Sequence, residues 1–320
     1  MVETSIDLKH LRTRFVSDYN LPIQVIASPY FEDRLKLLEE EYGAKTSYNN
    51  LLELIDSRFD GDSNKFLEYY HQVRDTIITT ILNSESYKEF ISNDKFVKNV
   101  KPICSNRNLY TNEQDGCMFI SYDMKKANFQ TLRYANPAIV YDADTYETFI
   151  GIFTDLDYIK HSKYTRQVIF GKLNPKRTMN LEKWITNEFA KTLNDLSIMK
   201  HCELFSLNAD EIILKWNGSE EEFEKADIVP SIVFEGVEFK ASKFKLHSRQ
   251  FKLATSSSIL TVYEKEDYLN AHKRILKGVP ATYMPQVYKL LGVMEIKPSD
   301  LVFYYEHELC QFLNPLELIK

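Results

Sequence analysis

The stretch Cys117-Met118-Phe119-Ile120-Ser121-Tyr122-Asp123 is the part of this sequence that decides its fold. Residues 117–122 form a short, nearly continuous apolar run, which is typical of a strand buried on both faces. Asp123 ends the run, so that a carboxylate follows directly after a buried strand. A carboxylate in a mostly apolar setting either takes up a proton or finds a cation. The stretch therefore predicts a central strand with a chemically active end.

A second acidic position lies at the tip of a predicted hairpin. Residues 203–207 and 211–216 are two apolar runs, and the tight polar turn Asn208-Ala209-Asp210 separates them, as in a β-hairpin. Adjacent carboxylates such as Asp210 and Glu211 repel one another unless a cation lies between them. Hard divalent ions take carboxylate oxygens as ligands. The hairpin and Asp123 together predict a site for Mg²⁺ or Mn²⁺.

The remaining pattern alternates between helical and extended segments. Apolar residues at i, i+3, i+4 and i+7 predict helices over 31–92, Lys125–Tyr134, 160–198 and 266–291. Alternating residues over 231–263 predict further strands, and the polar, irregular segment 95–115 is the best candidate for a domain boundary. These segments indicate an α+β fold.

Composition limits the class of protein. A chain of 320 residues can form one large domain or two to three closely packed ones. Its four cysteines are far apart without a CxxC pair, which argues against a zinc site or a disulfide framework and favours a reducing compartment. The sequence shows no signal peptide and no apolar run of about 18 residues. We therefore expect a cytoplasmic protein without a membrane segment.

Charge and residue usage add two further expectations. The net charge of −6 argues against a protein that coats nucleic acid indiscriminately, because such binding neutralises many phosphates with Lys and Arg. A local basic groove remains compatible with that charge. The abundance of Lys, Asn, Ile, Tyr and Phe hints at an AT-rich coding genome, as in many viruses and mobile elements; a viral protein would act in the host cytoplasm.

Three segments, taken in order, resemble motifs of palm-domain nucleic acid polymerases. Residues 122–129, with Asp123, resemble the first catalytic motif of reverse transcriptases. Residues 208–214 are similar to their aromatic-Ala-Asp-Asp hairpin, and equally to the apolar-His-Asp-Glu hairpin of family A DNA polymerases. Residues 163–171 resemble the fingers helix of family A polymerases, in which a basic residue precedes a Phe-Gly pair by four positions, as Arg166 precedes Phe170 here.

The resemblance implies an architecture and a reaction. It implies a palm-type antiparallel sheet over 101–250, with a helical fingers insertion at about 140–200, a helical N-terminal region over 1–100 and a mixed, thumb-like C-terminal region over 251–320. The implied reaction adds nucleotides to the 3′ end of a nucleic acid by two-metal catalysis. The implied partners are a primer and template, nucleoside triphosphates and other replication or transcription subunits.

The resemblance also implies roles for single residues. Asp123, Asp210 and Glu211 would be catalytic, and with Met124 they would form the metal site. The residues implied to bind the nucleotide are Asn128, Phe129, Lys163, Arg166, Phe170 and Lys172. Alternation of basic and aromatic residues over 239–252 predicts a nucleic-acid contact by Lys240, Lys243, Lys245 and Arg249, with Lys243 or Lys245 as a proton donor to pyrophosphate. The small Asn128, in the position that senses the sugar 2′ carbon, predicts that ribonucleotides are tolerated.

Departures from the family patterns keep alternatives open. Asn208 stands where an aromatic residue is usual, and Glu211 replaces the second Asp. A nucleotide cyclase with a Gly-Gly-Asp-Glu-Phe hairpin is a second enzyme class, although Lys125 stands where that family has an acid. A non-catalytic palm protein that binds nucleic acid or a replication partner is a third possibility. In the plainest interpretation, Asp123 caps the next helix and Asp210 belongs to an ordinary turn.

Overall fold

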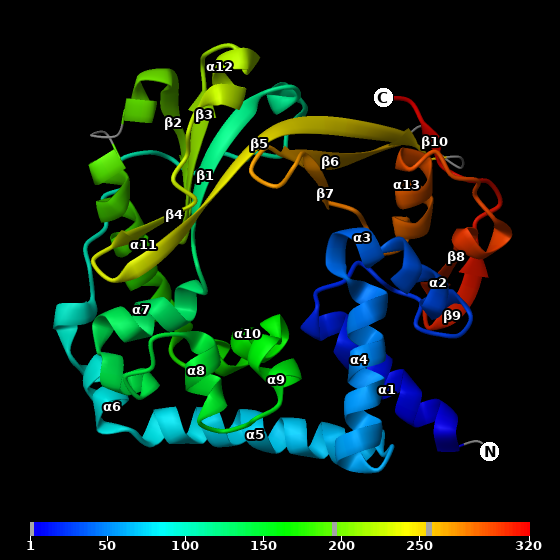
Figure 1. Cartoon of the computed structure of the whole chain (residues 1–320), viewed down its shortest axis with the longest axis horizontal. Helices are drawn as coiled ribbons and strands as arrows, with labels where there is room; N and C mark the ends of the chain where they lie inside the picture. The colour runs from blue at the N-terminus through cyan, green and yellow to red at the C-terminus, as the bar shows by residue number, and fades with distance from the viewer. Residues whose placement is uncertain (1–2, 194–196, 254–257) are drawn as a thin grey trace.

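A computed structural model describes residues 3–193, 197–253 and 258–320. The N-terminal third is helical, with a second group of helices inserted between strands β1 and β2 (Figure 1). The α-helices are α1 (Glu3–Asp18), α2 (Tyr30–Leu37), α3 (Glu39–Tyr42), α4 (Ala44–Phe59), α5 (Ser63–Asn83), α6 (Glu85–Ser92), α7 (Ala127–Ala135), α8 (Tyr146–Gly151), α9 (Asp157–His161), α10 (Lys163–Gly171), α11 (Pro175–Thr192), α12 (Glu220–Lys225) and α13 (Met284–Leu291).

The main sheet is antiparallel in every strand pair described. Its central path runs β2-β3-β1-β5-β6-β7, and β4 and β10 also pair with β5; β8 and β9 form a separate hairpin. The strands are β1 (Met118–Met124), β2 (Cys202–Leu207), β3 (Glu211–Trp216), β4 (Ser231–Phe234), β5 (Val237–Lys252), β6 (Ile259–Asp267), β7 (Lys273–Lys277), β8 (Val302–Tyr305), β9 (Glu308–Gln311) and β10 (Glu317–Leu318). Mixed helices and antiparallel sheet confirm the α+β prediction.

Local sequence signals explain where three of the helices begin. The Asp62 carboxylate accepts the backbone N–H groups of Asn64 and Lys65 and caps α5. Asn174 caps α11, and Pro175 occupies the first position of that helix, where its missing N–H costs nothing. Ser162 accepts the N–H of Thr165 and caps α10.

A buried polar cluster fixes the inserted helices to the N-terminal ones. Asp18 at the end of α1 is 2% exposed and accepts hydrogen bonds from Tyr70 of α5 at 2.7 Å, Tyr158 of α9 at 2.8 Å and Ser162 at 2.8 Å. Three neutral donors satisfy a buried carboxylate that would otherwise be costly to enclose. The start of α10, which Ser162 caps, is therefore fixed to α1 and α5.

The main core lies on one face of the sheet. Ile120, Tyr122 and Met124 of β1 contact this core, which continues through α7 and α11 into the N-terminal helices. The opposite face carries a smaller cluster that includes Phe119 and Phe244. β1 is thus buried on both faces along most of its length, which confirms the prediction for residues 117–122.

Some sequence predictions are confirmed and others are wrong. Helices over 31–92, the hairpin of β2 and β3, and the strands β4 to β6 are present as predicted. The helix predicted over 266–291 is wrong for most of its length, because β6 extends to Asp267 and β7 follows, leaving only α13 as a helix. β5 also runs through the boundary predicted at residue 250. The parts of these predictions that fall on residues 194–196 and 254–257 lie outside the described residues.

Candidate functional site

Asp123 shares one face of the sheet with two charged neighbours. In the register of the strands it lies opposite Glu211 of β3 and opposite Lys240 of β5. Residues directly opposite in antiparallel strands point to the same face, with Cβ atoms about 5 Å apart. Tyr122 and Met124 point to the other face and are buried in the main core. The acidic end of β1 therefore faces away from α7 and α11.

The hairpin tip is held against the end of β1. The N–H of Met124 donates to the carbonyl of Asp210 at 2.7 Å, and the N–H of Asn208 donates to the carbonyl of Glu211 at 2.9 Å. From α11, the Thr186 hydroxyl donates to the carbonyl of Ala209 at 2.9 Å. These bonds bring Asp210 and Glu211, which are distant from Asp123 in sequence, to the same end of the sheet.

The carboxylates of this site repel one another. Burial, followed by the negative charges of Asp210 and Glu211, raises the pKa of Asp123 to about 7, although Lys265 and Lys163 partly offset the rise. The Asp123 side chain remains accessible to solvent, but protein atoms on several sides leave it less water than it has in an extended chain. Burial also raises the pKa of Asp210.

A fourth carboxylate, Glu182 of α11, was missed by the sequence analysis. It is 6% exposed, and its Oε1 has no hydrogen-bond partner among the described residues. Burial raises its pKa to about 7, with the charge of Asp210 as the second cause. The sequence contains a signal for it, because Thr178, Glu182 and Ile185 follow i, i+4 and i+7 spacing on the buried face of α11. Acidic side chains are rarely buried without a partner.

Lys265 of β6 is a second residue that the sequence analysis missed. It pairs with Leu246 of β5, and Leu246 belongs to the smaller cluster, so Lys265 shares the face of Asp123. Its Nζ lies 4.0 Å from the centroid of the Phe244 ring. Burial lowers the pKa of Lys265, while the negative charges of Glu211 and Asp123 act to raise it. The sequence predicted strands only to residue 263 and a helix from residue 266, so Lys265 was not assigned to a strand.

α10 faces the acidic site with two of the predicted cations. The charge of Lys163 acts on Asp123. Arg166 has its guanidinium 5.7 Å from the centroid of the Tyr146 ring, and burial lowers its pKa, an effect that Tyr146 and Asp123 partly offset. Lys126, which follows β1, forms an ion pair with Glu147. The charges of Lys163 and Arg166 both act on Asp123.

Two aromatic residues predicted to bind the nucleotide lie in the core instead. Phe170 is 3% exposed and contacts the Tyr146 ring, and Phe129 is 1% exposed and contacts the rings of Tyr146 and Phe149. The prediction that Phe170 stacks on a base is wrong, because a buried ring has no free face. Asn128, next to Phe129, is half-buried in the first turn of α7.

The remaining predicted metal and nucleotide residues are less favourably placed. The Met124 side chain is 2% exposed and accepts from Thr131, which leaves only its backbone carbonyl for a metal. Lys172 is exposed at the end of α10, where its charge acts on Asp75 of α5. Within the described ranges, no three His, Cys, Asp or Glu side chains are arranged as a ready-made metal site.

The predicted nucleic-acid contacts on β5 separate into two groups. Lys243 is 3% exposed and donates to the carbonyls of Glu224 and Ala226 at 3.0 and 2.8 Å, so it cannot serve as a proton donor to pyrophosphate. Lys245 pairs with Glu220 at 2.6 Å, and Arg249 pairs with Glu264 at 2.7 Å. Lys240 is exposed beside Asp123 and has no ion-pair partner in the part of the chain that is described.

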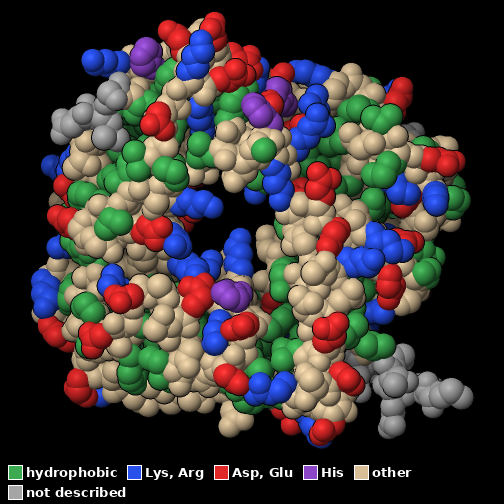
Figure 2. Space-filling view, viewed as in Figure 1, with side chains coloured by type: hydrophobic (Ala, Val, Ile, Leu, Met, Phe, Trp, Pro, Cys, Tyr) green, Lys and Arg blue, Asp and Glu red, His purple; other side chains and the backbone are tan. Residues whose placement is uncertain are grey.

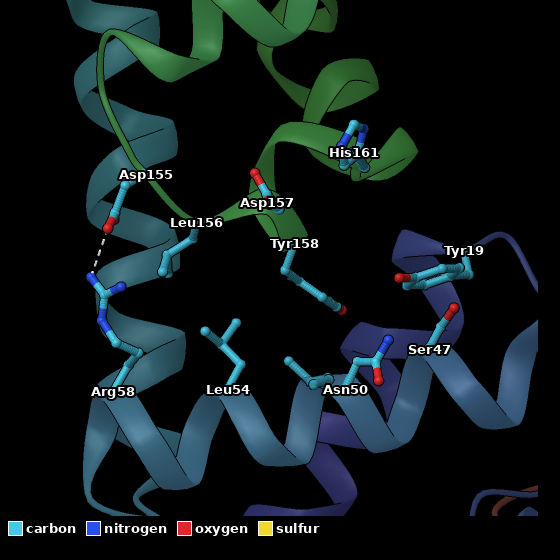
Figure 3. Close-up of a pocket in the computed structure, with 11 residues that line it drawn as sticks. Tyr19, Ser47, Asn50, Leu54, Arg58, Asp155, Leu156, Asp157, Tyr158 and His161 are labelled. Atoms are coloured by element: carbon cyan, nitrogen blue, oxygen red, sulfur yellow. Dashed lines mark hydrogen bonds and ion pairs between the residues drawn. The ribbon is translucent and has the colours of Figure 1, made fainter.

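Two cavities lie near these elements. One, of about 430 Å³, adjoins the hairpin and is lined by Asn106, Arg107, Asn108, Leu109, Tyr110, Asn208, Glu211 and Ile213. The other, of about 400 Å³, lies between α4 and residues 155–161 (Figure 3). There Leu54 and Asn50 face Leu156 and Tyr158, and the Arg58–Asp155 ion pair of 2.8 Å closes one end. Only the first cavity contacts a predicted catalytic residue.

Comparison with known proteins finds no match to the chain among protein-family profiles, curated proteins or solved structures. In the described residues, no helix combines the length and apolar character that crossing a membrane requires.

Proposed function

We propose that this protein is a nucleotidyltransferase with a palm-type sheet, which adds nucleotides to the 3′ end of a nucleic acid. The supporting observation is the convergence of Asp123 with Asp210 and Glu211 on one end of the sheet, opposite Lys163 and Arg166 of α10. Carboxylates facing cations across a gap suit a substrate that carries phosphates. If these three acids had only a structural role, placing mutually repelling carboxylates together would bring no benefit.

The donor set fits Mg²⁺ or Mn²⁺, because carboxylate oxygens are the ligands such ions take. Asp123, Asp210 and Glu211 would hold the ions, and the unpaired Oε1 of Glu182 is close enough for its titration to respond to Asp210. Bound ions would lower the pKa of the attacking hydroxyl and neutralise developing negative charge. Burial and, after it, repulsion from Asp210 and Glu211 raise the pKa of Asp123, and bound ions would stabilise its charged form.

The cations have distinct parts in this proposal. Arg166, braced on the Tyr146 ring, can donate two hydrogen bonds to phosphate oxygens, and Lys163 adds charge beside it. Lys265 takes the place that the sequence analysis assigned to Lys243 or Lys245, since it lies near Glu211 and Asp123. Its lowered pKa makes it a better proton donor to a leaving pyrophosphate.

The test is a transfer assay with Mg²⁺ or Mn²⁺, all ribo- and deoxyribonucleoside triphosphates, and primed or unprimed templates of DNA and RNA. We expect extended products with the unmodified chain and none with Asp123→Asn. Asp144→Asn is the matched control, because Asp144 is an exposed aspartate paired with Arg133. Absence of product from every sample would refute the enzyme and favour a non-catalytic palm protein that binds nucleic acid or a partner subunit.

A further inference from the structure

The chain closes on itself around a central opening. Figure 1 shows the sheet, the inserted helices and the N-terminal helices arranged as a ring, and Figure 2 shows an opening that the side chains leave free at its centre. The polypeptide itself connects every part of this ring except one. Between α2–α3 and the C-terminal elements β7, α13 and β8, the ring is closed by non-covalent contacts alone.

One part of this junction is made by α3. The Tyr288 hydroxyl of α13 donates to Glu41 Oε2 at 2.6 Å, and Lys273 Nζ donates to the Glu41 carbonyl at 3.2 Å. Met284, at the start of α13, is fully buried in the main core. A single short helix thus receives contacts from both β7 and α13.

The other part of the junction is made by β8. The Gln24 side chain donates to the Tyr304 carbonyl at 2.9 Å and accepts its N–H at 3.2 Å. Arg34 of α2 donates to the Val302 carbonyl at 2.8 Å in a buried position. Since each Gln24 and Arg34 bond uses a backbone group of β8, the junction depends on the fold of this hairpin.

The opening carries positive charge although the chain as a whole is acidic. Lys and Arg side chains gather around it in Figure 2, while the net charge is −6. α10, with Lys163 and Arg166, borders the opening opposite the sheet (Figure 1), and both charges act on Asp123. A local basic path on an acidic protein suits one phosphate backbone and not indiscriminate coating.

We infer that a single-stranded nucleic acid passes through this opening, beside Asp123, and is encircled by the closed chain. A positively charged path that follows one phosphate backbone is typical of proteins that bind single strands. The inference rests on the proposed function for the class of ligand, but not on catalysis.

Encirclement is tested by blocking the ends of the strand. A labelled DNA or RNA strand, longer than the roughly 4–16 nucleotides that a strand-binding fold covers, carries biotin at both ends and is studied without triphosphates. Streptavidin added before the protein should slow association at least about tenfold, the factor that 1.4 kcal/mol provides. Streptavidin added afterwards should slow dissociation to a similar extent. Equal rates with free and blocked ends would overturn encirclement, as would failure to bind any strand.

The junction supplies a second test. Tyr288→Phe removes the donor to Glu41 and should speed association with strands blocked beforehand by about tenfold, as the loss of one hydrogen bond to a charged group allows. Tyr305→Phe is the control, since Tyr305 is 62% exposed. Thermal unfolding of both variants should be measured to check that each one folds. Loading no faster than in the control would overturn the assignment of this junction as the gate.

The two proposals fail separately. If the end blocks change the rates of strand association and dissociation but the protein shows no transfer activity, encirclement is supported and the proposed enzymatic function is refuted. If the protein shows transfer activity but the end blocks leave the rates of strand association and dissociation unchanged, the proposed enzymatic function is supported and encirclement is refuted. The opening would then be a route for triphosphates.

Discussion

Asp123 of β1 lies directly opposite Glu211 of β3, with the Asp210 carbonyl accepting the N–H of the next residue, Met124. This register places two carboxylates on one face of the sheet without an intervening counter-charge from the hairpin. The negative charges of these two carboxylates repel one another, and this repulsion destabilises the folded state. The relationship leads to predictions about pH, because protonation relieves that cost.

We predict that Asp123→Asn stabilises the metal-free protein at pH 8 but not at pH 4. The pKa of Asp123 is about 7 in the folded chain and about 4 in an unfolded one. The folded state therefore binds the proton more tightly, and stability falls as pH rises from about 4 to 7. Allowing for solvent screening of an accessible carboxylate, the gain at pH 8 should be about 1 kcal/mol.

Urea unfolding with EDTA at both pH values measures this gain, with Asp144→Asn as the control. Added Mg²⁺ should then stabilise the unmodified chain more than the variant. An equal gain at pH 4 and pH 8 would show that the substitution acts through packing and not through charge.

Glu182→Gln should make the unfolding free energy less dependent on pH between about 4.5 and 7. Burial and Asp210 raise the pKa of Glu182 to about 7, so ionisation above that pH penalises the folded state. The pH-dependent loss should shrink by about 3 kcal/mol at most. Glu188→Gln on the same helix is the control, because Glu188 pairs with Lys191 at 2.6 Å. This variant should show the same dependence of unfolding free energy on pH as the unmodified chain. Parallel profiles for both variants would contradict the prediction.

Arg166→Ala should raise the KM for triphosphates by about 10- to 100-fold, since a hydrogen bond to a charged group contributes about 1.5–3 kcal/mol. Lys172→Ala should change KM less than about twofold, because Lys172 lies at the end of α10 near Asp75. Steady-state kinetics with both variants compares them. Equal effects would mean that general positive charge, and not the position of Arg166, determines binding.

Asn128→Phe should convert a protein that accepts ribonucleotides into one that prefers deoxyribonucleotides by about 10- to 100-fold. A bulky ring at this half-buried position would fill the space for the 2′-hydroxyl. Asn128→Ala is the matched variant, as it keeps the space and removes only the amide. Incorporation of paired ribo and deoxy substrates provides the measurement, and strict deoxy selectivity in the unmodified chain would refute the prediction.

Several features could be predicted from sequence because they depend on local patterns. The apolar run before Asp123 specified a buried strand, and two apolar runs around Asp210 specified a hairpin, since side-chain alternation and turn residues act over a few positions. Helical periodicity could also have identified Glu182, had a buried acid been sought among the apolar positions of α11.

Only the tertiary structure decided which charged groups meet. Lys243 and Lys265 are both lysines on strands of the sheet, yet one is buried against the backbone of 224–226 and the other lies beside Asp123 and Glu211. That difference depends on the pairing of β5 with β1 and β6, which no local pattern contains. The ring likewise arises from contacts such as Glu41 with Tyr288, because burial and long-range hydrogen bonds join segments whose sequences carry no sign of one another.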